Sequence, residues 1–424
     1  MKPKPWKPRL LMIANIVLIT SWIIGVFFAN TMSRDSLANR DQYSEKMYQD
    51  FPPREPSSFA LELEAWADHS DVEQLGDRLD RYLQQVFESG DRRLPEIPQE
   101  LQRYLDDNRA ELNQIRDRLA QDENLDFGLP YDVRTYNFST QLPKLSLPIR
   151  LSQLIMLNII ERHQAGDINQ TEASFNAILN LLKSLDKNPD LASQATLETH
   201  YKHLLNLIRQ LDDFPDNIPD NIKAKLEPAI ATHQNTSLSR LKFEAYFYSS
   251  TWTDSTLIEG APPIRQLLWP LATPYFNLIA AEVWQAERQL LEKMEEMDIC
   301  RLTPQELLEA IPSTQWSSID DAERNEYRFQ WWVRPQQLQF ALELSQNLQQ
   351  INEQARREGQ FPDAIAPIRS SSCEESQWVY EINSDETATI RLENIPNLIS
   401  EFGSPSYKTH HTIVTGSVTG SVAE

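Results

Sequence analysis

Twenty consecutive residues without a charge, Leu10 to Ala29, form the most continuous apolar segment of the chain. At about 1.5 Å per residue, a helix of this length spans about 30 Å, the hydrocarbon thickness of a bilayer. The sequence therefore predicts a single transmembrane helix over residues 10–29. Residues 1–9 form a basic tip before it, with four cations and no acid.

The basic tip indicates the orientation of this helix. Cations concentrate on the cytoplasmic side of a membrane-spanning helix, so we expect a cytoplasmic N-terminus and an extracytoplasmic domain. The prediction is a single-pass signal-anchor protein of the inner (plasma) membrane, which contacts the membrane through residues 10–29. A cleaved signal peptide is the alternative, with Thr31-Met32-Ser33 as the cleavage site. The apolar run exceeds the usual signal-peptide core of about 7–15 residues, which favours the uncleaved anchor.

Helical periodicity dominates most of the remaining chain. Residues 30–58 are polar and end in several prolines, which predicts a stalk. Residues 59–372 then repeat apolar positions at helix spacing, which predicts a mainly α extracytoplasmic domain of nine or ten helices. The clearest periodic runs are 101–119, 175–185 and 197–211.

Start signals and one partial repeat support stacked helix hairpins. Asn188-Pro189 fits a helix start, and Thr303-Pro304-Gln305-Glu306 matches a capping box. The stretch from Gly166 to Pro189 resembles a tetratricopeptide hairpin but lacks the 34-residue spacing of that family. We therefore expect a solenoid-like or bundle arrangement of hairpins, without membership of the family.

Three segments lack the helical pattern. Residues 122–150 are too long for an ordinary connection and are expected to form an ordered loop over the body. In residues 373–402, Trp378, Tyr380 and Ile382 lie at alternate positions, a turn follows, and the alternation resumes, which predicts a β-hairpin packed on the helices. Residues 403–424 are rich in Ser, Thr, Gly and Val and are expected to be a disordered tail.

Charge narrows the list of partners. The chain carries 40 Lys and Arg residues against 62 Asp and Glu residues, a formal net charge of −22. Phosphate binding needs clustered cations, so we expect no nucleic-acid partner. Only 10 glycines occur, which argues against phosphate-cradling loops and turn-dense β architectures.

The two cysteines of the chain, Cys300 and Cys373, are a candidate disulfide in an oxidising compartment. Two buried free thiols are an equally open reading. A bridge between them would connect the β-hairpin region to the helical body.

Aromatic residues concentrate between residues 243 and 284, where nine of 42 are Phe, Tyr or Trp, against 9% for the chain. Inside this segment, residues 266–281 are uncharged and include Pro270 and Pro274. Three interpretations are open: a buried helix kinked at the prolines, an apolar groove for a partner helix or lipid, or a segment lying on the membrane surface. With a second cluster at residues 327–332, the candidate ligand or partner surface is Tyr246, Trp252, Trp269, Trp284, Trp331 and Trp332.

No catalytic motif is complete. Asp126-Phe127-Gly128 copies the magnesium motif of protein kinases, but the Gly-rich loop and catalytic loop of a kinase are missing. His200 and His203 have metal-ligand spacing on a helix, but the sequence places no acidic ligand with them. We therefore assign no catalytic residue, no cofactor and no metal ligand, and whether the protein is an enzyme stays open.

Three functions fit this organisation. The first is a non-catalytic scaffold or adaptor of the cell envelope that binds a protein partner, because stacked hairpins leave long grooves. The second is a protein that binds or hydrolyses an envelope glycan, which requires carboxylates converging in a cleft beside the aromatic residues. The third is a lipid-handling protein with an apolar tunnel built around residues 266–281.

Overall fold

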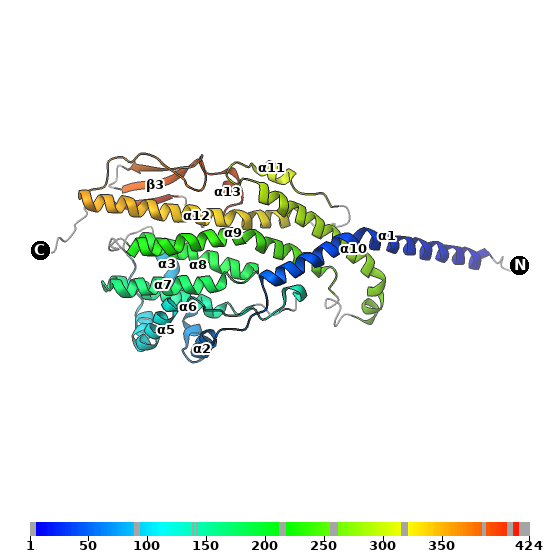
Figure 1. Ribbon diagram of the computed structural model, residues 1–424, viewed down its shortest axis with the longest axis horizontal. Helices are drawn as coiled ribbons and strands as arrows, with labels where there is room; N and C mark the ends of the chain where they lie inside the picture. Colours follow the sequence, from blue (N-terminus) through cyan, green and yellow to red (C-terminus); the bar gives the residue numbers. More distant parts are fainter. Residues whose placement is uncertain are drawn as a thin grey trace.

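The computed structural model describes residues 6–88, 94–137, 140, 143–211, 218–254, 262–314, 321–383, 387–404 and 410–414. Within these ranges the chain is mainly α, with a small antiparallel sheet near the C-terminus, as the hydrophobic periodicity predicts. The long helices α7, α8, α9 and α12 run along the body, and α1 extends from one end of it (Figure 1).

The described α-helices are α1 (Trp6–Asp50), α2 (Ser58–Ala67), α3 (Gly76–Glu88), α4 (Gln99–Asp107), α5 (Arg109–Gln121), α6 (Ser146–Gln164), α7 (Ile168–Leu185), α8 (Leu191–Gln210), α9 (Ile218–Thr251), α10 (Pro263–Glu296), α11 (Pro304–Glu309), α12 (Asp321–Glu358) and α13 (Asn397–Phe402). Two short 3-10 helices are η1 (Val72–Leu75) and η2 (Val133–Thr135). The described strands are β1 (Ile368–Arg369), β2 (Gln377–Ile382), β3 (Thr387–Glu393) and β4 (His410–Val414).

Eleven described α-helices lie between residues 58 and 358, slightly more than the sequence predicts. One cause is that the periodic run 101–119 divides into α4 and α5 at Asn108, whose side chain donates to the Tyr104 carbonyl oxygen at 2.9 Å. Asparagine competes in this way with the regular helical hydrogen bonds. The helix start expected at Asn188 lies two residues later, because Asp190 caps α8 by accepting from the Ser193 N–H at 2.8 Å. The capping box at Thr303 and Glu306 is confirmed.

Helix α1 does not end with the apolar run at Ala29. It continues to Asp50, so the prediction of a stalk over residues 30–58 is wrong for residues 30–50. Small residues at four-residue spacing, Gly25, Ala29 and Ser33, lie on one side of α1, and a Cβ at Gly25 would clash with the Tyr275 hydroxyl of α10. Ala29 and Ser33 are 1% and 2% exposed. Small residues allow two helices to approach closely, and this tertiary contact stabilises the polar extension of α1.

Two hydrophobic cores share α9 and α12. The first collects side chains from α2 to α8, and the second from α10, α11, α13 and the sheet. Along α9, Ile230 belongs to the first core and Phe243 to the second. Along α12, Leu342 belongs to the first and Phe340 to the second. These two helices therefore join the halves of the body.

The loop after α5 is ordered in its described residues, as expected, and runs from Asp122 to Leu145. Leu129 pairs with Arg54 through the backbone, and Arg54 Nε donates to Asp126 Oδ2 at 2.9 Å. Gly128 has a φ of +80°, and a Cβ there would lie 2.8 Å from the Arg54 carbonyl oxygen. Asp126-Phe127-Gly128 therefore positions the connection between α1 and α2.

The predicted β-hairpin is present. β2 and β3 pair antiparallel with Trp378 opposite Leu392, and β1 and β4 complete a four-stranded sheet in the order β1-β2-β3-β4. The prediction of a disordered tail over residues 403–424 is wrong for β4, which pairs with the open edge of β3. A strand added there supplies hydrogen bonds that an open edge lacks.

Two contacts attach the sheet region to the helices. Cys300 and Cys373 are disulfide-bonded, which is the first of the two readings of the sequence. Glu343 of α12, 5% exposed, accepts hydrogen bonds from Ser370 Oγ at 2.8 Å and Trp378 Nε1 at 2.9 Å. A buried carboxylate is tolerated when its oxygens are paired in this way.

Breaking the disulfide should destabilise the body. The bridge closes a loop with a sequence separation of 73 residues. Loop-closure entropy predicts that Cys300→Ser lowers the free energy of unfolding by about 4 kcal/mol, measured by urea denaturation. Reductant should reproduce the loss in the wild type and leave the variant unchanged. Equal stability of the two oxidised proteins would contradict the prediction.

Candidate functional site

The six candidate aromatic residues do not form one surface. Trp331 and Trp332 are 5% and 8% exposed and belong to the second core. Trp252 is half-buried at the end of α9, and Trp269 stacks on Phe276 with ring centroids 4.8 Å apart. Tyr246 and Trp284, which belong to the same core, are in an edge-to-face ring contact with centroids 6.5 Å apart.

The uncharged run 266–281 divides into two parts. From Leu278 onward, apolar side chains of α10 are buried, as the buried-helix interpretation predicts, and from Trp284 they belong to the second core. Before that point the helix is largely exposed, with Leu268 and Leu271 at 50% and 48%, so the buried interpretation is wrong there. Composition alone cannot separate these parts, because a core-facing and a lipid-facing helix use the same residue types.

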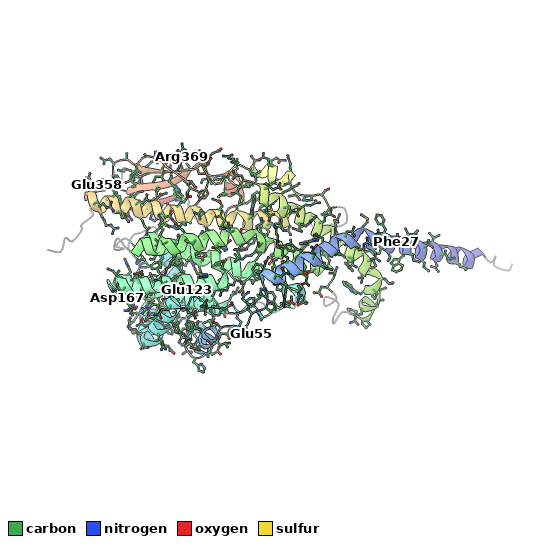
Figure 2. All side chains as sticks on the ribbon, in the orientation of Figure 1. Phe27, Glu55, Glu123, Asp167, Glu358 and Arg369 are labelled. Atoms are coloured by element: carbon green, nitrogen blue, oxygen red, sulfur yellow. A yellow bond between two sulfur atoms is a disulfide. The ribbon has the colours of Figure 1, made fainter. Side chains whose placement is uncertain are left out.

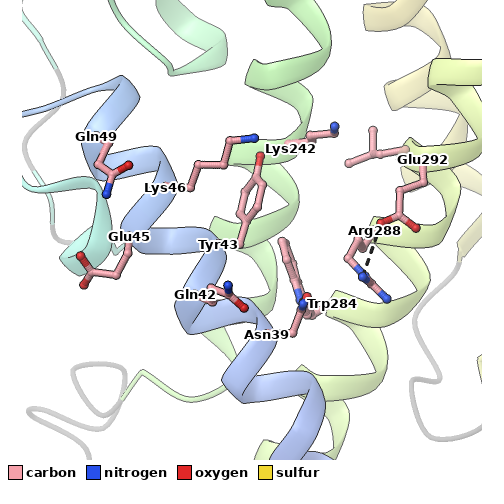
Figure 3. A pocket seen from close by; sticks show the side chains of 11 residues that line it. Asn39, Gln42, Tyr43, Glu45, Lys46, Gln49, Lys242, Trp284, Arg288 and Glu292 are labelled. Atoms are coloured by element: carbon pink, nitrogen blue, oxygen red, sulfur yellow. Dashed lines mark hydrogen bonds and ion pairs between the residues drawn. The ribbon is translucent and has the colours of Figure 1, made fainter.

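An open groove of about 510 Å³ lies between α1, α9 and α10 (Figure 3). Trp284 forms part of its lining, together with residues of α1 from Asn39 to Gln49 and with Lys242 of α9. The sequence analysis included Trp284 but missed every contribution of α1, because residues 30–58 were read as a stalk. The amphipathic spacing of Asn39, Tyr43 and Lys46 was the available signal.

Two aromatic rings form the apolar part of the groove. Tyr43 and Trp284 have centroids 5.1 Å apart at 45°, and Trp284 Nε1 donates to Asn39 Oδ1 at 3.2 Å. Trp284 is 2% exposed, whereas Tyr43 is half-buried. Burial, with smaller contributions from Asp50 and Glu295, raises the pKa of Tyr43 above its usual value. The phenol therefore stays protonated at neutral pH.

Charged side chains form the rim of the groove. Lys46, Lys242 and Arg288 contribute three cations, against the carboxylates of Glu45 and Glu292. Arg288 Nη1 lies 3.4 Å from Glu292 Oε1, with both side chains substantially exposed. Exposed pairs of this kind contribute little to stability, so they can exchange for the charges of a partner. Lys46 has no ion pair among the residues that the structure describes.

The groove is suited to binding more than to acid–base chemistry. Glu45 and Glu292 project from different helices and lie far apart across the opening in Figure 3. Within the described ranges, no three His, Cys, Asp or Glu side chains are grouped as a metal site. A mixed-charge rim around aromatic rings is the usual composition of a protein-binding surface.

A second cluster of charged side chains is buried inside the body. His233 of α9 is fully buried, with Nε2 3.3 Å from Glu198 Oε1 of α8 and Nδ1 3.6 Å from Asp186 Oδ1 at the end of α7. Arg240, 1% exposed, pairs with Asp186 and donates to the carbonyl oxygen of Asn188 at 3.3 Å. This network, which the sequence analysis missed, ties three helices together out of reach of a substrate.

The two carboxylates control the charge of this network. Burial lowers the pKa of His233, and so does the Arg240 guanidinium, whose Nη1 lies 2.9 Å from His233 Nδ1. Asp186 and Glu198 outweigh both effects and raise the pKa above its usual value. Burial likewise opposes ionisation of Asp186, but His233 and Arg240 hold its pKa below the usual range. The folded chain therefore binds the His233 proton more tightly than the unfolded chain does.

His200 and His203 have separate structural roles. His200 Nδ1 donates to the Thr196 carbonyl oxygen at 2.6 Å, and burial lowers its pKa. His203 stacks on Phe87 with centroids 4.2 Å apart, and burial lowers its pKa to about 3. The rings are 6.2 Å apart, and each has its own partner.

Comparisons of this chain with protein-family models, with curated proteins and with solved structures found no match.

The His233 network predicts a pH dependence of stability. Because the folded pKa is raised, the contribution of His233 is complete below about pH 6.5 and is lost as pH rises through the folded value. His233→Gln should lower the free energy of unfolding by about 2 kcal/mol at pH 5.5 and by less at pH 9. Urea denaturation of both proteins at the two pH values measures this difference.

His203→Gln is the matched control. The pKa of His203 is lowered in the folded protein, so the unfolded chain takes up this proton first as pH falls below about 6.5. His203 therefore lowers the stability of the wild-type fold on acidification. This variant should therefore gain stability relative to the wild type on acidification, the reverse of His233→Gln. The same trend in both variants would contradict the assignment.

Proposed function

We propose that the protein is a membrane-anchored helical scaffold of the cell envelope that binds a protein partner in the groove between α1, α9 and α10. The continuity of α1 carries the proposal: one helix contains the apolar run and also lines the groove. Asn39 lies ten residues beyond Ala29, about 15 Å along the helix axis. A continuous helix holds the groove at a fixed height above the membrane, which a flexible linker would not do.

The packing of α1 supports an anchor that is retained. Helix α1 is long and apolar enough to span a membrane, as a signal sequence would also be. Cleavage at Ser33 would remove Gly25 and Ala29, which contact the body. The four cations before Leu10 favour a cytoplasmic N-terminus, and the disulfide favours an oxidising compartment for the body.

The groove fits a polypeptide better than a glycan or a lipid. Sugar binding uses exposed aromatic faces, but Trp284 is 2% exposed and its indole N–H is already bonded to Asn39. A lipid chain would require an apolar lining, but charged groups surround this opening. A protein segment can place an apolar side chain on Tyr43 while its charges pair with Lys46 and Arg288.

The topology can be tested with reporter fusions in bacterial cells. Alkaline phosphatase fused after residue 424 should be active, because it folds only outside the cytoplasm, whereas the same enzyme fused before Met1 should be inactive. N-terminal sequencing of the mature chain should give a start ahead of Leu10. Activity of the N-terminal fusion alone would reverse the orientation.

Partner binding can be tested by photo-crosslinking in native cells. A photoreactive residue at Gln42, in the groove, should capture a discrete protein, whereas one at Glu358, at the far end of α12 (Figure 2), should not. Reversing two rim charges with Lys46→Glu and Arg288→Glu should reduce the adduct about tenfold, since each exposed pair contributes up to about 1 kcal/mol. Equal adducts at both positions, or capture of lipid alone, would contradict the proposal.

A further inference from the structure

The first half of α10 carries an exposed apolar stripe. Ile264, Leu268, Leu271 and Tyr275 are 66%, 50%, 48% and 39% exposed. Their spacing of four, three and four residues places them on one face of the helix. An amphipathic helix normally turns such a face toward the core, so this stripe indicates contact with something outside the described chain.

Two prolines direct this segment away from the rest of its helix. Pro270 and Pro274 lie inside α10, where each removes a backbone hydrogen bond and bends the helix. The part before the bend runs across the axis of α1 rather than along it (Figure 1). Figure 2 places this part at the level of Phe27 on α1.

One contact fixes the height of the stripe on the anchor. The Tyr275 hydroxyl lies against Gly25, four residues before the end of the apolar run at Ala29. Four residues correspond to about 6 Å along α1. Helices that lie in the membrane interface are buried about 5–10 Å into the boundary between headgroups and acyl chains. The distance of about 6 Å from the end of the apolar run to the Tyr275 contact lies within this range.

The surroundings of the stripe are also compatible with lipid. Residues 260–281 contain no acid and a single cation in a chain of net charge −22. The neighbouring surface of α1 is apolar and exposed as well, with Ile24 at 63% and Phe27 at 74%. Both helices therefore expose apolar side chains close to the contact between Gly25 and Tyr275.

We propose that residues 263–275 of α10 lie in the outer interface of the bilayer that α1 spans, as a second membrane contact. The inference depends on the retained anchor of the proposed function but not on the groove or its partner. A spanning helix alone leaves the body free to rotate and tilt. A second helix lying across it in the interface fixes both motions and sets the direction in which the groove opens.

The full chain reconstituted in phosphatidylcholine vesicles allows a direct test. Cys300 and Cys373 are bonded to each other, so a spin label reacts only with an introduced cysteine. Three single variants are compared: Leu271→Cys in the stripe, Val17→Cys in the apolar run, and Leu308→Cys in α11. Leu271 and Leu308 are matched, at 48% and 49% exposure. Power saturation measures collisions with oxygen, which concentrates in lipid, and with a polar nickel chelate, which stays in water.

Oxygen collisions should exceed nickel collisions at positions 17 and 271, with the reverse order at 308. A label at 271 that behaves like the label at 308, while 17 remains in lipid, would overturn the membrane contact and leave the anchor intact. Labels at both 17 and 271 in water would overturn the anchor as well. Mutual broadening of labels at 271 from two molecules would identify a second copy of the chain as the occupant and also overturn the proposal.

Discussion

The close packing of α1 on α10 is the constraint on which the arrangement of this protein depends. Gly25 leaves no space for a Cβ beside Tyr275, and Ala29 and Ser33 follow on the same side of the helix, both buried. Because this contact begins inside the apolar run and continues beyond it, the apolar run is packed together with the body. The groove and the apolar stripe therefore both have defined positions relative to the apolar run of α1.

The interior of the body is held by polar contacts as well as by hydrophobic packing. His233 and Arg240 connect three consecutive helices through Asp186 and Glu198, while Glu343 connects α12 to the sheet. Such groups are costly to bury without partners, so each contact specifies one relative placement of its elements. Removing one partner therefore destabilises more than the lost hydrogen bond suggests, because the remaining charge stays buried.

Local sequence patterns predicted much of the fold, but they could not predict contacts between segments that are distant in the sequence. Apolar periodicity identified α7 and α8, apolar residues at alternate positions identified β2 and β3, and the capping box at Thr303 was correct. The stalk prediction failed because the helical state of residues 30–50 depends on α10, more than 200 residues away. The tail prediction failed at β4 for the same reason, since a five-residue strand depends on the open edge of β3.

Local sequence patterns likewise predicted only part of the candidate site. Aromatic clustering led to Trp284, but most members of the cluster are core residues, and the groove needed Tyr43 and Lys46 from a segment that looked irregular. The run 266–281 supplied both a core helix and an exposed stripe, divided near Pro274. This division has a mechanical consequence, because the groove and the stripe lie on one bent helix that also packs on the anchor. Under the proposed function and the proposed interface contact, α10 transmits a force on the bound partner to the membrane interface and to α1 together, so the body resists rotation more than a single anchor allows.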